Sequence, residues 1–374
     1  MRIAVDLTSL ADNFSGIERY AANIALNLIR NDRDNRYILQ FKDGVHELFL
    51  DAELLGNAEV IVIPSNGLGK LVFSQLLLPA RLRKLDADLN VFLAFPSPLL
   101  FFGPSISTIH DLSCWDCPET MTGKSRLLWR ALDKKAASSE YGVLTISEFS
   151  RSRIVDHYRL PKEKVSVVYC GIDYEKFNVG LITENELIRV RAKYHLPQTF
   201  LLSLSTIEPR KNLAALINAW VSLSVDTVIS DDLVLAGRKG WKTEAILQSI
   251  PESLHDRVHF TGFVDDDDLP ALYTLADLFV FPSIYEGFGL PPIEAVSCGA
   301  RVLCSDIPCH KEICGDSAFY FSLSDPNSLA DSIKKLLIDN PGCQSRKTTV
   351  RSFDWPSESR KLVNLIESSR SKNA

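Results

Sequence analysis

The segment DLFVFPSIYEGFGLPPIEAVSCG, residues 277–299, decides how the fold of this chain is interpreted. It opens with a short apolar run that ends in Pro-Ser, which is typical of a buried strand. The glycines of EGFG permit backbone conformations closed to other residues and let a ligand approach the main chain. Pro291 and Pro292 suit the first turn of a helix, which Gly299 would end. The segment therefore predicts a strand, a glycine loop and a helix in succession.

Two carboxylates belong to this segment, Glu286 in the loop and Glu294 in the first turns of the helix. The N–H groups at a helix start, together with the helix dipole, favour a bound anion. Such a site could hold a phosphate with its backbone and polar hydroxyl groups with its two carboxylates.

Strand-like and helix-like runs alternate on both sides of this segment, and the series restarts near residue 198. This alternation indicates parallel sheets with crossover helices. The chain of 374 residues is therefore predicted to form two doubly wound α/β domains, 1–180 and 181–355, with a linker at 171–185. The predicted strands occupy 2–8, 35–42, 58–64, 87–95, 105–111, 141–147, 163–172, 199–206, 233–238, 258–263, 277–283, 301–306 and 318–322.

Ligands of such sheets bind beyond the carboxyl ends of the strands, and the cleft between two such domains is the default active site. The run STIEPRKN at 205–212 follows a strand and opens a helix. Arg210 and Lys211 would lie near that helix start, where positive charge is unfavourable. A bound diphosphate would resolve the conflict. The alternative is a solvated pair on a turn.

Two further strand ends carry candidate residues. His110, beside an Asp, comes directly after the apolar part of the run at 105–111, at the strand end, where it could orient a substrate or move a proton. The alternative is a histidine that only forms a hydrogen bond at a strand end. Gly16 begins a helix after the first strand, with Ser15 as its predicted cap. This loop lacks G-x-G-x-x-G, so a NAD site is poorly supported, and an anion or sugar loop stays open.

Composition limits the class of protein. The net charge of −6 argues against nucleic acid as the main partner. No run approaches the roughly 20 apolar residues of a membrane span. The start of the chain resembles a β-strand more than a signal peptide, so a cytoplasmic location is expected. Basic and apolar residues at helical spacing favour core-facing helices, with contact to a membrane surface as the alternative; that alternative rests on Arg126, Trp129, Arg130 and Lys134.

Cysteines and acids leave two alternatives open. The eight cysteines lack zinc-finger spacing, so reduced, structural thiols are expected, with a redox or metal role as the alternative. The four acids at 265–268 are attributed chiefly to a helix cap, and the alternative is a metal site.

Several motifs together resemble the retaining glycosyltransferases of family 4, which have the GT-B fold of two Rossmann-like domains facing across a cleft. The most specific is SIYEGFGLPPIEAVSCGARVLCSD, which resembles the family's Glu-x7-Glu segment. EPRKN, LAGRKGW, VHFTGFV, IHDLS, TISEFSR and GIDYEKF resemble further family segments. The tail at 356–374 looks like the closing helix that crosses back to the first domain. The resemblance covers nearly the whole chain.

This resemblance implies a nucleotide-diphosphate sugar as donor and a glycan or lipid-linked glycan as acceptor. Glu286 would face the hydroxyls of the transferred sugar, and Glu294 would bind the nucleotide ribose. Lys211 would hold the departing diphosphate with help from Arg210. His110 would lie near the sugar. Both carboxylates would position substrate, and neither a metal nor a cofactor would be needed.

The backbone would complete the donor site that the resemblance implies. Phe288, Gly289 and Leu290 would offer N–H groups to the sugar or the diphosphate. Gly16 would belong to the loop beside the donor phosphates and the acceptor.

One position departs from the family pattern. Many relatives carry a Gly-Arg pair on the strand before EPRK, where this chain has Ser205 and Thr206. Arg210 or Arg238 would then compensate for the missing cation. A subgroup resembling bacterial mannosyl- and rhamnosyltransferases also has a small residue there, which favours GDP-mannose and surface-polysaccharide or O-antigen synthesis. The alternatives are a UDP- or dTDP-sugar donor, another GT-B enzyme such as an epimerase or phosphorylase, and a catalytically silent scaffold.

Overall fold

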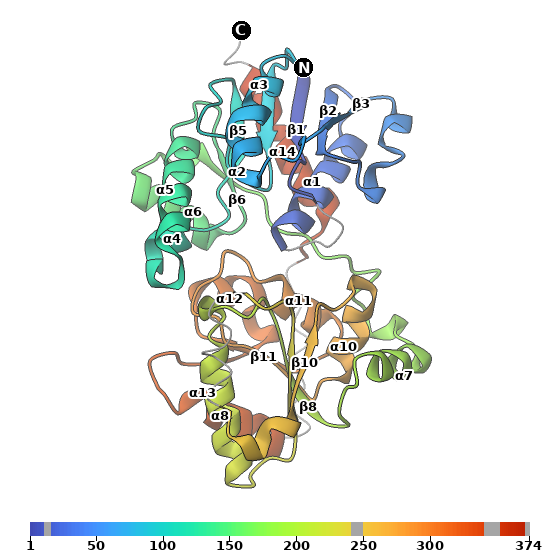
Figure 1. The fold of residues 1–374 in the computed structure, drawn as a ribbon, viewed down its shortest axis with the longest axis vertical. Helices are drawn as coiled ribbons and strands as arrows, with labels where there is room; N and C mark the ends of the chain where they lie inside the picture. The colour runs from blue at the N-terminus through green and yellow to red at the C-terminus, as the bar shows by residue number, and fades with distance from the viewer. Residues whose placement is uncertain (11–15, 241–249, 340–351, 371–374) are drawn as a thin grey trace. The chain divides into compact units, whose positions relative to one another are not determined.

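The computed structural model describes residues 1–10, 16–240, 250–339 and 352–370. The chain divides into two compact units (Figure 1). Unit 1 comprises Met1–Gly171 and Phe353–Ala374, and unit 2 comprises Ile172–Ser352. The sequence had suggested 180/181 and 355/356 as the corresponding boundaries.

Unit 1 is built on a seven-stranded parallel sheet in the order β3-β2-β1-β4-β5-β6-β7. Most of its buried strand residues are apolar, as expected for a parallel sheet covered on both faces, but Ser105, Ser107 and Thr108 of one strand are also buried. Each strand overlaps a run that the sequence predicted as strand. The strands are β1 Arg2–Asp6, β2 Arg36–Lys42, β3 Ala58–Ile63, β4 Leu89–Phe92, β5 Ser105–Thr108, β6 Val143–Thr145 and β7 Val165–Val167.

Helices cover this sheet, and their starts follow local capping chemistry. Thr122 accepts a hydrogen bond from the Ser125 N–H at the start of α5, and Ser147 does the same for Ser150 at the start of α6. The C-terminal helix α14 packs along α1 within this unit (Figure 1). The helices are α1 Gly16–Asn31, α2 Lys70–Val72, α3 Leu78–Leu82, α4 Ser113–Asp116, α5 Gly123–Ala137, α6 Glu148–Tyr158 and α14 Trp355–Arg370.

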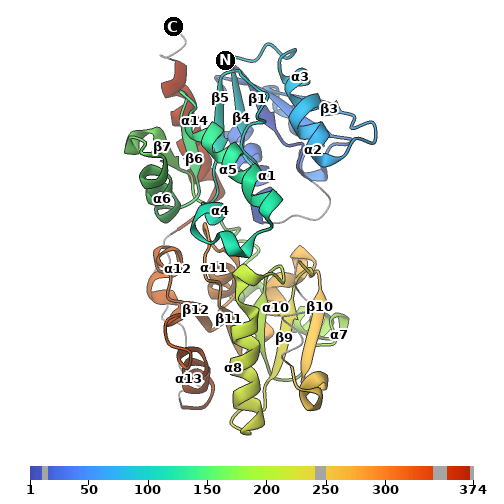
Figure 2. The same ribbon diagram turned by 60° about the vertical axis from the view of Figure 1, so that its left-hand side comes forward.

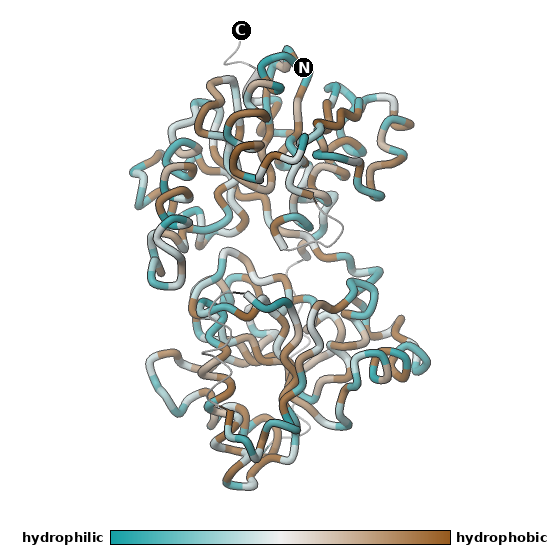
Figure 3. The backbone as a smooth tube through the Cα atoms, in the orientation of Figure 1, coloured by the Kyte–Doolittle hydropathy of each residue, from teal (hydrophilic) through white to brown (hydrophobic). Residues whose placement is uncertain are grey.

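Unit 2 repeats the architecture with a six-stranded parallel sheet in the order β10-β9-β8-β11-β12-β13. Apolar residues predominate along the central strands of this sheet (Figure 3). The strands are β8 Phe200–Leu204, β9 Asp232–Ala236, β10 Val258–Gly262, β11 Leu278–Phe281, β12 Val302–Ser305 and β13 Phe319–Phe321. The described helices are α7 Glu184–Lys193, α8 Leu213–Val225, α10 Leu269–Leu275, α11 Leu290–Ser297, α12 Pro308–Cys314 and α13 Ser328–Lys334.

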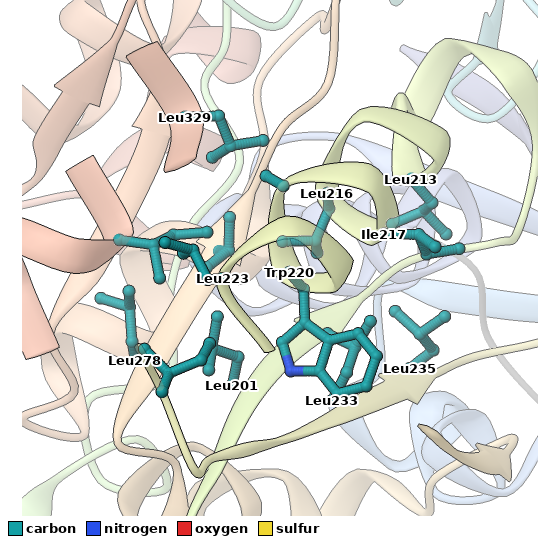
Figure 4. Close-up of a cluster of buried hydrophobic side chains, with 14 of the residues drawn as sticks. Leu201, Leu213, Leu216, Ile217, Trp220, Leu223, Leu233, Leu235, Leu278 and Leu329 are labelled. Atoms are coloured by element: carbon teal, nitrogen blue, oxygen red, sulfur yellow. The ribbon is translucent and has the colours of Figure 1, made fainter. Parts of the chain in front are cut away.

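Alternate residues of the second sheet face two separate helix layers. Leu233 and Leu235 point to the face covered by α8, where Trp220 is fully buried (Figure 4). Helices α8 and α13 contact one another on that face (Figure 2). Phe279 points the other way and meets the ring of Tyr273 on α10 at 5.3 Å. Helices on both faces make the sheet doubly wound, as the sequence predicted.

The segment predicted as a linker, 171–185, contains the point where the chain passes from unit 1 to unit 2, after Gly171, and its other residues belong to unit 2. Phe177 is buried within 6.3 Å of the Tyr273 ring, and the Lys176 Nζ lies 2.7 Å from an Asp267 carboxylate oxygen. These contacts fix the segment to the unit. Helix α7 then starts at a capping box formed by Thr183 and Glu186.

In both sheets the chain starts in the middle and builds outward in two directions. The order reverses between β1 and β4 in unit 1 and between β8 and β11 in unit 2. Loops at the carboxyl ends of those strands diverge and leave room for a ligand. The topology therefore indicates where each unit's site residues should be sought.

Candidate functional site

In unit 2, three charged side chains meet at the point where the strand order reverses. Arg210 and Lys211 lie in a 3₁₀ turn, Pro209–Lys211, that follows β8. Glu286 lies in the loop after β11, which pairs directly with β8. Because the two strands are parallel neighbours, their carboxyl-end loops lie side by side. The sheet thus joins two motifs that are 75 residues apart.

Glu286 is hydrogen-bonded to both cations. Lys211 Nζ lies 2.5 Å from Oε1, and Arg210 Nη1 lies 2.9 Å from Oε2. Arg210 also donates to the Tyr285 carbonyl at 3.0 Å and lies 3.1 Å from a Glu208 carboxylate oxygen. The Glu286 side chain is only 7% exposed. The sequence predicted that a phosphate would balance these cations; the structure shows that a carboxylate of the same chain does so.

The charges around Glu286 set its protonation state. Burial would raise the pKa of Glu286, but the nearby charges of Lys211 and Arg210 lower it to about 2. Burial and the neighbouring Arg210 cation lower the pKa of Lys211, while Glu286 opposes that shift. Glu286 is therefore ionised at neutral pH. An ionised carboxylate accepts hydrogen bonds from hydroxyl groups and has no proton to donate.

The glycine loop and the start of α11 follow the predicted geometry. Gly289 precedes the helix with φ of 90°, in the left-handed region that favours glycine. Pro291 and Pro292 lie in the first turn and carry no N–H group, so Leu290 contributes the first amide of the helix. Phe288 is buried, and its carbonyl accepts a hydrogen bond from Cys309 Sγ at 3.3 Å. Helix α12 is therefore hydrogen-bonded to the loop that would supply the backbone donors.

Glu294 occupies a separate environment on α11. It is 3% exposed, and the Tyr273 hydroxyl donates to its Oε2 at 2.9 Å. Its charge adds to burial in raising the pKa of the Cys298 thiol to about 12. The two carboxylates of the glycine segment therefore have different partners: Glu286 faces cations and Glu294 a phenol. Sequence reasoning missed Tyr273, because nothing local links α10 to α11.

His310 on α12 is a second residue that the sequence analysis missed. It is fully buried, and its Nδ1 lies 3.0 Å from the Ser305 carbonyl oxygen, which fixes Nδ1 as the donor. Burial lowers its pKa to about 4, so the ring is neutral. The ring packs against Phe281, and its Cδ2 is 3.6 Å from where a Cβ on Gly289 would lie. The His310 ring therefore packs close to the glycine loop.

In unit 1, His110 follows β5 at the carboxyl edge of the sheet. Its Nε2 lies 3.0 Å from the Leu93 carbonyl oxygen and 3.1 Å from that of Ala94, so Nε2 is the donor. Burial lowers the pKa of His110, against the effect of Asp111. The ring lies edge-on to Tyr20, with centroids 5.3 Å apart. The histidine is thus hydrogen-bonded at a strand end, and its Nδ1 is left as the acceptor.

Gly16 is the first residue of α1, and among the described residues, its own chain neighbours and helix backbone aside, no atom lies within 4 Å of where its Cβ would be. The predicted cap, Ser15, lies outside the described residues.

Arg238 is one of the two cations that could replace the arginine found in many relatives. It is exposed on the loop after β9 and stacks over the Phe263 ring at 4.7 Å. Its loop runs against the β8 loop. A Cβ on Gly237 would lie 2.1 Å from the Ser205 carbonyl oxygen, so only glycine fits there. Arg210, by contrast, is already bound to Glu286.

The acidic run 265–268 does not cap a helix through its side chains, and that prediction was wrong. Instead, Asp268 is 2% exposed and lies 2.7 Å from Arg189 and 2.6 Å from Lys193, both on α7. The Tyr194 hydroxyl also donates to Asp268 at 2.8 Å. The acids hold α7 onto the unit. Within the described ranges, no group of three or more His, Cys, Asp or Glu could hold a metal ion.

The basic helix α5 is partly committed to its own unit. Arg130 donates to the Cys114 carbonyl at 2.9 Å and stacks over Trp115 at 4.0 Å. Trp129 lies 5.7 Å from the Phe95 ring. Trp129 and Arg130, two of the four residues on which the membrane-surface alternative rests, therefore make contacts within the unit. In the part of the chain that the structure describes, no helix combines the length and apolarity that crossing a bilayer requires. The seven cysteines described are buried free thiols.

Comparison with known proteins gives two family models that cover most of the chain. The model for glycosyltransferase family 4 matches residues 14–176, and the model for glycosyl transferases group 1 matches residues 185–352. The chain is 33% identical over 241 residues to O-antigen chain mannosyltransferase B of Escherichia coli. That alignment covers 63% of this chain and 62% of the relative, so it spans less than two thirds of that protein. O-antigen chain mannosyltransferase RfbU of Salmonella typhimurium is 29% identical over 61% of this chain and 60% of its own length.

Solved structures share the fold over nearly the full length. The structure of Anabaena HepE, solved with UDP and glucose, aligns with a TM-score of 0.73 at 19% identity, covering 98% of this chain and 100% of that one. WaaG, a glycosyltransferase of lipopolysaccharide biosynthesis, aligns with a TM-score of 0.68 at 18% identity over 97% of this chain and 95% of its own. Both sheets, both family models and these neighbours agree: the chain belongs to the family 4 glycosyltransferases of the GT-B fold.

Proposed function

We propose that this protein is a retaining glycosyltransferase that moves a hexose from a nucleotide-diphosphate sugar to a glycan or lipid-linked glycan. The proposed donor is GDP-mannose, and the proposed pathway is bacterial surface-polysaccharide or O-antigen synthesis in the cytoplasm. The curated relatives support the sugar and the pathway, because they are O-antigen mannosyltransferases. The proposed partners are the donor and the acceptor.

The observation that carries the proposal is the ionised Glu286 held by both Lys211 and Arg210 beside the start of α11. In the proposed reaction, the bond between the sugar's anomeric carbon and the phosphate oxygen breaks, and negative charge builds on the diphosphate. Lys211, Arg210 and the backbone amides at Phe288, Gly289 and Leu290 stabilise that charge.

The new bond forms between the anomeric carbon and the acceptor hydroxyl, on the face that the phosphate leaves, so the configuration is retained. The hydroxyl proton passes to the departing phosphate oxygen. Glu286, with its low pKa, accepts a hydrogen bond from a sugar hydroxyl and does not act as the acid. This scheme differs from glycosidases, in which two carboxylates flank the reacting bond.

Three further residues complete the proposed donor and sugar site. Glu294, fixed by Tyr273, binds the ribose hydroxyls of the nucleotide. His110 hydrogen-bonds the substrate through its second ring nitrogen, Nδ1, and Gly16, at the start of α1, lies beside the donor phosphates and the acceptor. We propose that no metal ion or cofactor takes part, because the chain supplies its own cations at the phosphate position.

A thermal-shift panel with GDP, UDP, ADP and dTDP and their mannose, glucose and rhamnose conjugates tests the donor. A ligand present at 100 times its dissociation constant adds about 2.7 kcal/mol to the free energy of unfolding. We expect a response to GDP and GDP-mannose, followed by GDP release on addition of acceptor. A response to another nucleotide alone would change the proposed donor to a sugar conjugate of that nucleotide. No thermal shift with any ligand of the panel, for a folded protein, would favour a catalytically silent scaffold.

A further inference from the structure

Unit 1 contains an open cavity of about 670 Å³ at the amino-terminal end of β5. Its walls are the loop that leads into β5, residues 97–105, and the end of α5 with the turn after it, residues 131–141. The volume lies within the range of ligand pockets. Ser105 begins β5, and His110 follows five residues later, so the extended chain places the cavity about 17 Å from His110 within unit 1.

The loop carries two adjacent phenylalanines, of which one is buried and the other is exposed. Phe101 points inward, is 3% exposed and packs against Phe92 at 5.7 Å. Gly103 leaves room for that ring, because a Cβ there would lie 2.6 Å from Phe101 Cζ. Phe102 is left 81% exposed on the cavity wall. The Lys135 Nζ lies over this ring, 4.5 Å from its centroid, and most of the remaining ring surface is open to a ligand.

The polar part of the wall is rich in hydroxyl groups. Ser138 Oγ donates to the Lys135 carbonyl at 2.7 Å, and Ser139 Oγ donates to the Ser105 carbonyl at 2.5 Å. Both hydroxyl protons are thus committed to the backbone. Ser139 Oγ already accepts a hydrogen bond from the Tyr141 N–H at 3.2 Å. The lone pairs that remain on the two oxygens can accept further hydrogen bonds, so the wall suits a ligand that brings its own donors.

Charge in the cavity does not favour an anion. Lys135 Nζ donates to the carbonyls of Leu99, at 2.7 Å, and Phe101, so its charge is already directed into the wall. The cavity also lies at the carboxyl end of α5, where the helix dipole is negative. The exposed Lys134 and Glu140 carry opposite charges. A neutral, hydroxyl-rich ligand with an apolar face fits this lining better than a phosphate.

We propose that this cavity is a second carbohydrate site, which binds an inner sugar of the glycan that the enzyme extends. The inference rests on the proposed function and adds to it that the acceptor is a chain of several sugars. The C–H face of a sugar ring packs on Phe102, and its hydroxyls donate to Ser138 and Ser139. Only a chain long enough to reach from His110 to the other end of β5 engages both sites.

The test compares the variants F102A and F102Y with the control L127A in the full chain. Leu127 is 73% exposed on α5 and does not line the cavity. Calorimetric titration uses an α-linked mannose octasaccharide and a mannose disaccharide as probes. We expect F102A to weaken octasaccharide binding about tenfold, which corresponds to 1.4 kcal/mol. F102Y, which keeps the ring, and L127A should bind the octasaccharide like the wild type, and disaccharide binding should not change.

A transfer assay with GDP-mannose gives the second readout. F102A should raise the KM for the octasaccharide about tenfold, with kcat and transfer to the disaccharide unchanged. Equal octasaccharide affinity in wild type and F102A, or no octasaccharide binding at all, overturns the inference. So does loss of binding to phosphatidylglycerol vesicles in F102A with glycan binding intact, because a lipid surface would then be the occupant. If wild type binds the octasaccharide more tightly than F102A yet transfers no mannose, the donor assignment fails and the second site stands.

Discussion

The Nζ atom of Lys211 lies 2.5 Å from Oε1 of Glu286, so a cation from the β8 loop is paired with a carboxylate from the β11 loop. Both groups are largely buried, and Arg210 shares the same carboxylate. A buried pair of this kind is costly to break, because the remaining charge loses its partner. The pair also places two cations where a departing phosphate would need them. Stability and the proposed chemistry therefore depend on the same contact.

Replacement of Glu286 by glutamine should separate these two effects. E286Q keeps the shape but removes the charge, so we expect transfer to fall at least 100-fold and the free energy of unfolding to fall by about 3 kcal/mol. GDP should still bind, because Lys211 and Arg210 are then available to its phosphates. Turnover, urea unfolding and GDP titration measure the three outcomes.

The control for this prediction is E208Q, whose carboxylate pairs with Arg210 and acts on the Lys211 ammonium only through its charge. It should keep most of the activity. Turnover of E286Q close to that of wild type would remove Glu286 from the mechanism.

Loss of the Tyr273 hydroxyl should weaken nucleotide binding without touching the reacting sugar. Y273F removes the donor to Glu294 and leaves a buried carboxylate with one bond fewer, a cost of about 1–3 kcal/mol in stability. We expect GDP affinity to fall several-fold and kcat at saturating donor to stay near that of wild type. Y194F, which removes the hydroxyl that donates to the buried carboxylate of Asp268 beside α7, is the matched control. A fall in kcat with unchanged KM for the donor would contradict the ribose role of Glu294.

The pH dependence of stability should report Asp133, a buried residue of α5. Burial raises the pKa of Asp133 to about 7. A hydrogen bond from Cys114 opposes this shift, and the charge of Asp111 adds to it. Because the folded pKa lies above the unfolded value of 3.8, stability is lost as pH rises from about 4 to 7. The loss is roughly 4 kcal/mol when complete. Tyr158 and Arg130 are the other ionisable groups that act on this Asp133–Cys114 cluster.

The variant D133N should therefore be more stable than wild type at pH 8, with the difference vanishing near pH 4, as measured by urea unfolding. Glu286 acts in the opposite sense: its folded pKa of about 2 lies below 4.5, so its contribution is present above pH 4.5 and lost toward pH 2. An identical pH profile for D133N and wild type would refute the assignment to Asp133.

Chelation of metal ions should leave transfer unchanged. Arg189, Lys193 and Tyr194 already bind the buried carboxylate of Asp268. We expect equal initial rates with 5 mM EDTA and with added Mg²⁺ or Mn²⁺, within the roughly twofold scatter of such assays. In parallel, D268N should lower the free energy of unfolding by about 3 kcal/mol, because two cations lose their buried partner. Strict dependence of the rate on Mg²⁺ would revive a metal role for the acidic run.

The strand pattern of both sheets could be predicted from local sequence, because apolar runs ended by glycine and proline mark parallel strands whatever the partners are. The shape of the glycine loop and the start of α11 followed for the same reason: Gly289 and the paired prolines restrict the backbone on their own.

Only the tertiary structure decided which groups meet. The pairing of Lys211 with Glu286 depends on β8 and β11 becoming neighbours, a consequence of strand order that no local signal encodes. The same holds for Tyr273 on Glu294, for the attachment of α7 through Asp268, and for the outward turn of Phe102. The sequence by itself determined the elements and the class of site, because these depend on residues close together in the chain. Partners and protonation states depend on burial and on charges brought together from distant segments, and these arise only when the sheets assemble.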